Sequence, residues 1–139
     1  WQIGDILEMM DSYRIPLIVP AREAGCDSIY VLSKKFSNVP VIITNTGYWQ
    51  NRQLYKLAEM SGNVYFEISS FLHYNGIEDF ALRYGSRRLL FGTNMPFQEP
   101  GPALFRVMYS GLDYEGKKAV ASENLRKIIS GVRIQESVI

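Results

Sequence analysis

Histidine and cysteine, which often act as general bases and nucleophiles in enzymes, are scarce in this sequence. The 139-residue chain has one His, His73, and one Cys, Cys26, which is predicted to be a small buried residue. Glu67 lies inside an apolar run and Glu23 follows another, and a carboxylate or imidazole so placed could serve as a general base. Each also has a structural interpretation, since Glu67 could pair with an Arg, Glu23 could begin a helix and His73 could be a loop residue. Glu23, Glu67 and His73 are therefore the catalytic candidates.

The composition argues against several classes of partner. Fifteen Lys and Arg against 14 Asp and Glu give a net charge of +1, which provides no electrostatic case for nucleic acid or an anionic membrane. No apolar run approaches the roughly 18 residues of a membrane span. The start lacks the basic and apolar regions of a signal peptide, and Trp1 is not a natural initiator. We therefore expect a cytoplasmic protein with residues missing upstream.

Four short apolar runs predict parallel strands near residues 16–20, 40–45, 63–69 and 88–93. Their nearly continuous hydrophobicity is typical of strands that are covered on both faces. Between them, apolar residues recur at helical spacing, and further helices are predicted before the first strand, over 3–13, and after the last. Arg83, Arg87 and Arg88 lead into the last strand at the opposite rim and are predicted to be solvated. The class is α/β, with right-handed βα units.

Two architectures fit four such units. An open doubly wound sheet would normally carry a Gly-rich phosphate loop after its first strand, but residues 19–23 read VPARE. Four βα units forming the C-terminal half of a (β/α)₈ TIM-type barrel, which needs about 250 residues in full, fit better. Residues 1–139 are then a single domain and a fragment of a longer barrel. Its exposed edges and apolar interior would require the missing N-terminal half, a second copy in a homo-oligomer, or a partner.

Several stretches resemble the amidohydrolase-related family of metal-dependent hydrolases, which also includes some decarboxylases. Residues 89–96, LLFGTNMP, resemble its last-strand signature F-G-[ST]-D-W-P. Residues 63–69, NVYFEIS, resemble its N-V-Y-[VF]-[DE]-x-S strand, and residues 39–47, VPVIITNTG, its strand ending in x-H-x-G. Residues 122–129, SENLRKII, resemble its closing G-N-A-x-R-[LI] helix. The resemblance implies a TIM barrel with a divalent metal such as zinc, and a hydrolase or a related lyase.

The resemblance also implies metal ligands that this chain lacks. The family binds its ion through H-x-H on the first strand, which would lie upstream of Trp1, His residues on middle strands and an Asp on the last. The matching positions here hold Pro20, Asn45 and Asn94. A neutral amide neither holds a divalent ion by charge nor takes a proton from metal-bound water, and proline has no side-chain donor or acceptor. One His and one Cys cannot form a conventional zinc cage either. We expect no cofactor within this chain.

Barrel enzymes build their sites at the carboxyl ends of the strands. That end should carry a neutral set rich in amides and aromatics, which suits a small organic or sugar-like ligand. The ligand-binding candidates are Asn45, Tyr48, Trp49, Ser69, His73 and Asn94. The alternative is that these aromatic side chains pack the loops together at a barrel opening that no longer binds a ligand.

Three functions stay open from the sequence. The first is an amidohydrolase-like barrel with a degenerate metal site that binds a small organic molecule and acts, if at all, through Glu23, Glu67 or His73. The second is a non-catalytic structural or interaction module that keeps the barrel fold. The third is a working metal hydrolase whose ligands all come from upstream residues. No feature of the sequence names a substrate.

Overall fold

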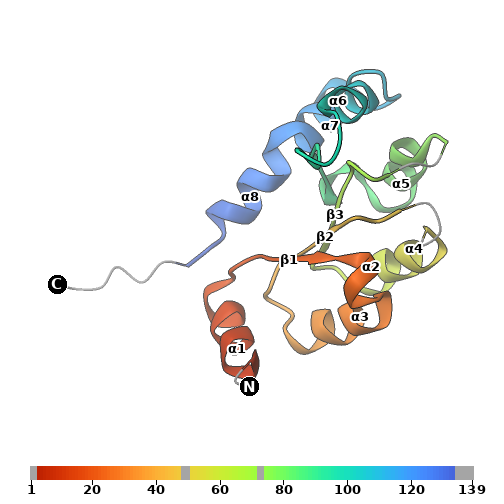
Figure 1. Ribbon diagram of the computed structural model, residues 1–139. Coiled ribbons are helices and arrows are strands. Elements are labelled where there is room, and N and C mark those ends of the chain that lie inside the picture. Colours follow the sequence, from red (N-terminus) through yellow and green to blue (C-terminus); the bar gives the residue numbers. More distant parts are fainter. Residues whose placement is uncertain (1–2, 48–50, 72–73, 134–139) are drawn as a thin grey trace.

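The computed structural model describes residues 3–47, 51–71 and 74–133. Four parallel strands form one sheet in the order β1-β2-β3-β4, as predicted (Figure 1). The strands are β1 Leu17–Pro20, β2 Val41–Thr44, β3 Val64–Glu67 and β4 Leu89–Leu90. Strands that follow one another along the chain are neighbours in the sheet, which is the arrangement of a barrel wall rather than of a doubly wound sheet.

Helices connect and flank the strands. They are α1 Ile3–Tyr13, α2 Ala21–Ala24, α3 Cys26–Lys35, α4 Asn51–Met60, α5 Gly76–Tyr84, α6 Pro100–Met108, α7 Tyr114–Lys118 and α8 Asn124–Ser130. A 3₁₀ turn, η2 Ser86–Arg88, precedes β4, and a π-helical segment, η3 Ala119–Glu123, joins α7 to α8. The short α2 was not predicted; it is separated from α3 by Gly25, whose φ of 73° favours glycine. Within the described ranges, no helix combines the length and apolar character that a membrane crossing requires.

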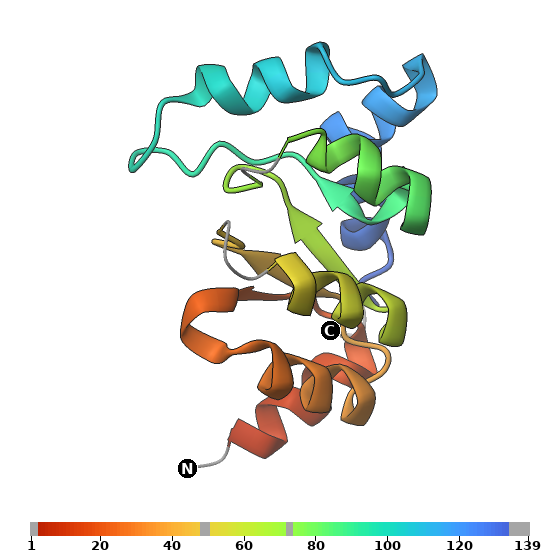
Figure 2. The ribbon, with the colours of Figure 1, turned by 90° about the vertical axis from the view of Figure 1, so that its right-hand side faces the viewer.

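The main core lies between the outer face of the sheet and the helices α3, α4 and α5, which cover that face (Figure 2). Alternate strand residues point to this side because side chains alternate along a strand. The fully buried members include Val41, Ile43, Val64, Phe66 and Leu89. Phe66 packs against Phe80 of α5 with ring centroids 4.9 Å apart. Burial of these side chains fixes the positions at which the strands end.

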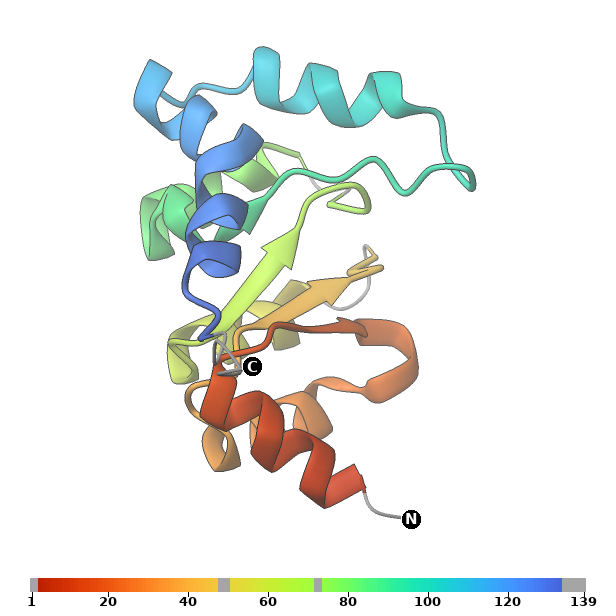
Figure 3. The ribbon, with the colours of Figure 1, turned by 90° about the vertical axis from the view of Figure 1, so that its left-hand side faces the viewer.

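The inner face, which would line a barrel, is covered unevenly. Ile42 of β2, Tyr65 of β3 and Leu90 of β4 pack with Ile128 of α8. Figure 3 shows α8 running beside β3 and β4 on this side of the sheet, while β1 lies away from it. Ile18 of β1 is 65% exposed. This apolar strand residue is therefore open to a further part of a barrel wall.

The β4 strand is shorter than the predicted 88–93, and its outer edge bonds to the C-terminal helices. The Phe91 N–H donates to Val120 O at 3.0 Å, and Asn124 Nδ2 donates to Leu89 O at 2.8 Å. On the other edge, the Ile68 N–H donates to Leu90 O at 3.0 Å and continues the pairing with β3. The η3–α8 segment thus occupies the edge of the sheet that a further strand would otherwise use.

Polar side chains close the amino-terminal end of the sheet. Arg88 donates from Nε, Nη1 and Nη2 to Val64 O, Ala58 O and Ser61 O. Asn63 Nδ2 donates to three further carbonyls, those of Ser33, Phe36 and Val39. The prediction that Arg88 is solvated is therefore wrong, because the carbonyls at this rim need donors once the helices bury them. Arg83 and Arg87 are exposed, as predicted.

Candidate functional site

The carboxyl end of β3 holds Glu67, whose side chain is fixed by Ser69. The Ser69 N–H donates to Glu67 Oε1 at 2.6 Å, and Ser69 Oγ donates to Oε2 at 2.7 Å. Glu67 lies on the inner face, since Phe66 before it belongs to the outer core and side chains alternate. Ser69 itself is 2% exposed. The buried serine therefore orients the carboxylate, and both carboxylate oxygens act as acceptors.

Gly92, two residues beyond β4, allows the Glu67 side chain to lie where it does. A Cβ at this position would stand 2.6 Å from Glu67 Cδ and 2.7 Å from its Cγ, closer than real atoms approach. Only glycine leaves that space free. The glycine of the FGTN stretch is thus explained by packing against the carboxylate of the neighbouring strand.

Arg106 of α6 contacts the segment directly after β3, which also contains Ser69. Its Nη1 donates to Ile68 O at 3.1 Å and to Ser69 O at 2.7 Å. Partial burial lowers the pKa of the Arg106 guanidinium, and the negative charge of Glu67 opposes that change. Glu67 forms no ion pair with an Arg among the described residues, and its oxygens accept bonds from Ser69 instead.

Asn45 and Asn94 follow the ends of β2 and β4 in the left-handed backbone region. Their φ angles are 52° and 55°, which asparagine tolerates better than most residues. Next to Asn45, Thr46 is fully buried, and its Oγ1 has no hydrogen-bond partner among the described residues. A buried hydroxyl without a partner is costly to the fold, and at 0% exposure it lies out of reach of a ligand.

The residues at this end do not fit the divalent metal that the family resemblance implies. Pro20 ends β1 without a side-chain ligand, and Asn45 and Asn94 provide neutral amides. Both oxygens of Glu67 already accept bonds from Ser69. In the described part of the chain, no three His, Cys, Asp or Glu side chains gather as metal ligands. These positions therefore lack the charged set that holds zinc or manganese.

The other candidate residues are not brought together by the described structure. Glu23 is exposed in the first turn of α2, where a negative charge suits the helix end. Cys26 begins α3, and burial, with a smaller effect of Asp27, raises the pKa of its thiol. Its chemistry is therefore that of a protonated, weakly nucleophilic side chain. Tyr48, Trp49 and His73 lie outside the described residues.

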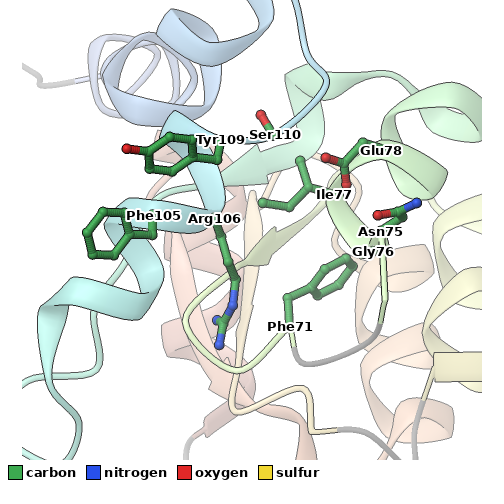
Figure 4. A pocket seen from close by; sticks show the side chains of 9 residues that line it. All are labelled: Phe71, Asn75, Gly76, Ile77, Glu78, Phe105, Arg106, Tyr109 and Ser110. Carbon is green, nitrogen blue, oxygen red and sulfur yellow. The ribbon is translucent and has the colours of Figure 1, made fainter.

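A cavity of about 250 Å³ adjoins this end of the sheet. Figure 4 shows the Arg106 side chain descending between the wall formed by α6 and the loop that carries Phe71. Sequence reasoning missed Arg106, although it stands three residues after Ala103, which is buried, and directly before Val107, which is also buried. That position on the border of the apolar face was the available signal.

No protein-family model and no curated protein sequence matches the chain. Solved structures do match it. One is a 2,6-dihydroxybenzoate decarboxylase in complex with 2,6-dihydroxybenzoate, at a TM-score of 0.70 and 12% identity over 93% of this chain and 55% of that chain. Another is a dihydroxybenzoic acid decarboxylase from Polaromonas sp. JS666 with bound manganese and the inhibitor 2-nitroresorcinol. It matches at a TM-score of 0.71 and 13% identity over 99% of this chain and 56% of that chain.

The chain thus spans about half the length of the solved structures that it matches. At such low identity the likeness concerns the fold alone. Four parallel strands with flanking helices give the chain the fold of about half of a TIM barrel, as the sequence predicted.

Proposed function

We propose that this chain is one domain of an amidohydrolase-like barrel that binds a small organic molecule at the carboxyl ends of its strands. The observation that carries the proposal is the unused hydrogen-bonding capacity at that end. Arg106 uses only Nη1 among its donors within the described residues, and Asn45 and Asn94 are part-exposed at the ends of β2 and β4. Barrels place their ligands at this end of the sheet, where polar groups face the mouth.

The solved structures support a ligand of modest size. One contains 2,6-dihydroxybenzoate and the other 2-nitroresorcinol, both single-ring aromatic molecules. In this chain, Asn45 and Asn94 supply amide groups at the ends of β2 and β4. The degenerate metal site belongs to the same proposal, because Pro20, Asn45 and Asn94 replace the family's ligands. We retain the cytoplasmic location as a prediction from composition.

Glu67 is the catalytic candidate that the geometry supports best. It lies on the inner face at the carboxyl end of β3, and Ser69 holds it in one orientation. Each oxygen of the Glu67 carboxylate accepts one bond from Ser69 and keeps a further lone pair, with which it could accept a proton from a ligand. Any reaction at this mouth would fall in the hydrolase class or the related lyase class.

Titration calorimetry of the full chain with resorcinol, a neutral single-ring ligand, tests the binding site. Asn45→Gly and Asn94→Gly remove the amides and keep the left-handed backbone free of strain. Each should weaken binding about fivefold, the effect of one lost hydrogen bond. Arg14→Gly is the control, since Arg14 also has a positive φ, of 57°, but lies before β1 at the opposite end. No binding, or equal affinity in all three variants, would contradict the proposal.

A second candidate function is an interaction module, and an apolar groove favours it. Beside β4, a groove of about 530 Å³ lies between Phe91 and the helices α6 and α7. Leu104, Met108 and Tyr114 line it and are 49%, 53% and 76% exposed. Analytical ultracentrifugation of the full chain and of Met108→Lys distinguishes this function, because a charge in the groove should abolish any association that uses it.

A further inference from the structure

Two cavities adjoin each other at the amino end of the sheet, opposite the proposed binding site. The first has a volume of about 300 Å³, and three cationic side chains line it: Arg14 before β1, Arg87 before β4 and Lys127 of α8. The second has a volume of about 400 Å³ and shares Arg14, Pro40 and Tyr65 with the first. Together they offer a charged compartment beside a larger, polar one.

Hydrogen bonds hold the three segments that carry these cations close together. The buried Asn124 of α8 donates from Nδ2 to two carbonyls of the η2–β4 segment, at 2.8 and 2.9 Å. Just beyond α8, the Arg133 N–H donates to Tyr13 O at the end of α1, at 2.8 Å. Figure 3 shows α8 running beside the sheet toward the end of α1. The fold itself therefore gathers the three charges at one cavity.

No carboxylate balances the three cations within the described part of the chain. The described lining of both cavities contains no acidic residue, and no described carboxylate oxygen lies within 4.0 Å of the three cations. Glu123 acts on Lys127 only at longer range, because its Oε1 pairs with Lys118 Nζ at 3.0 Å. Asp11 of α1 accepts bonds from Asn38 with both of its oxygens. Like charges repel one another, so an anion is the natural occupant of this cavity.

The backbone of Arg14 supports a role for its side chain. Its φ is 57°, directly after α1, in a position where helices commonly carry glycine. The next N–H, that of Ile15, donates to Met10 O at 2.9 Å, so the end of the helix imposes this conformation. Glycine would adopt it without strain. An arginine in a strained position at the wall of a cationic cavity suggests that the charge is used.

The charge and lining of the two cavities fit a phosphate group with a polar body. Three cations from three segments match the several oxygens and the two negative charges of a phosphate better than the single charge of a carboxylate. Tyr65, which lines both cavities, adds a hydroxyl donor. The second cavity is lined by polar residues such as Ser37 and Asn38, both exposed. Such a lining suits hydroxyl groups rather than an apolar ring.

We propose that the first cavity binds the phosphate group of a small phosphorylated polyol, on Arg14, Arg87 and Lys127, with the hydroxyl-bearing body in the second cavity. Barrel enzymes commonly bind phosphate at the carboxyl ends of their strands, whereas this site lies at the amino ends. It is therefore a second site, independent of the proposed function. A neutral ligand of the barrel mouth gains nothing from its charges.

Titration calorimetry of the full chain with glycerol 3-phosphate, inorganic phosphate and glycerol, in a low-salt buffer free of phosphate, tests the assignment. Both phosphates should bind and glycerol should not, and glycerol 3-phosphate should bind about fivefold more tightly than inorganic phosphate because its hydroxyl groups add hydrogen bonds. Arg87→Gln and Lys127→Gln should each weaken phosphate binding about fivefold, as expected of one lost ion pair. Arg126→Gln is the matched control, since Arg126 is exposed on α8 next to Lys127 but does not line the cavity. It should change the affinity less than about twofold.

Arg14→Gly separates this site from the one at the barrel mouth. The variant should weaken phosphate binding about fivefold, leave resorcinol affinity unchanged, and unfold at the same temperature or a higher one, because a φ of 57° suits glycine. A loss of stability in this variant would contradict the role assigned to its side chain.

The remaining outcomes are distinct from failure of the proposed function. No binding of either phosphate, or an equal loss of affinity in Arg126→Gln and Lys127→Gln, would overturn the phosphate site whether or not resorcinol binds. Equal affinity for the two phosphates would overturn the placement of the polyol body in the second cavity.

Discussion

The two ends of the sheet use the same kinds of polar residue in opposite ways. At the amino end, all three guanidinium nitrogens of Arg88 donate to carbonyls, and so does the amide of Asn63. At the carboxyl end, Arg106 donates only from Nη1, and the hydroxyl of Thr46 finds no partner among the described residues. Saturated groups stabilise the fold, whereas the unused nitrogens of the part-exposed Arg106 remain available to a ligand; the fully buried Thr46 hydroxyl does not.

The largest effect is expected at Arg88. Arg88→Gln would leave carbonyls of Val64, Ala58 and Ser61 without donors and would remove the cation above the Phe66 ring, 5.6 Å away. We expect the free energy of unfolding to fall by about 3 kcal/mol. Urea denaturation measures this free energy. Arg87→Gln is the control, because Arg87 is exposed and its substitution should change the free energy of unfolding by less than about 0.5 kcal/mol. Equal losses of stability in the two variants would refute the claim that Arg88 stabilises the fold at the amino end of the sheet.

A somewhat smaller loss is expected at Asn63. Asn63→Ala should lower the free energy of unfolding by about 2 kcal/mol because three buried carbonyls lose their shared donor. Asn38→Ala provides the comparison, since Asn38 bonds only to Asp11 on the surface. Asn38→Ala should lower the free energy of unfolding by about 0.5 kcal/mol, which is the contribution of one exposed hydrogen bond. Thermal unfolding, monitored by circular dichroism, measures the loss of stability in each variant. A larger loss in Asn38→Ala than in Asn63→Ala would contradict this account.

Gly92 leaves the space that the Glu67 side chain occupies at the carboxyl end of the sheet. Gly92→Ala should cost about 1–2 kcal/mol because the added Cβ displaces Glu67 from Ser69. In Glu67→Ala the same substitution should cost about 1 kcal/mol less, since the obstructing carboxylate is gone. A double-mutant cycle by urea denaturation measures this coupling. Strictly additive effects would show that Glu67 does not constrain position 92.

The smallest effect on stability is expected at Asn94. Because its φ is 55°, Asn94→Ala should cost about 1 kcal/mol, while Asn94→Gly should change stability by less than about 0.5 kcal/mol. Both variants lose the amide, so both should bind resorcinol more weakly. Unfolding curves and calorimetry together separate backbone strain from ligand contact. A destabilised Gly variant would mean that the Asn94 amide supports the fold.

The sequence predicts the fold well because the strand signals are local. Continuous apolar runs with turn residues after each helix identify four strands and their order without any knowledge of long-range contacts. The ends were predicted less well: β4 stops at Leu90, and the next residue, Phe91, donates its N–H to Val120 O, 29 residues later along the chain. Such an edge contact leaves no trace in the local pattern.

The site was predicted only in part, for the same physical reason. Glu67 and Ser69 were both identified as candidates from one strand motif, but the hydrogen bonds between them were not predicted. Arg106 meets Ser69 across 37 positions of sequence, and only the packing of α6 brings them together. Arg88 was misjudged because a charged residue beside a strand is normally solvated, unless buried carbonyls require its donors.

The most direct test of the account is a chemical-shift map of the full chain titrated with resorcinol. The account predicts that amide shifts concentrate at residues 44–47, 67–69 and 92–94, at the carboxyl end, while those of residues 61–64 and 86–89 at the amino end stay in place. Shifts centred on the amino end, or none anywhere at saturating resorcinol, would contradict the claim that the carboxyl end of the sheet is the binding end for resorcinol.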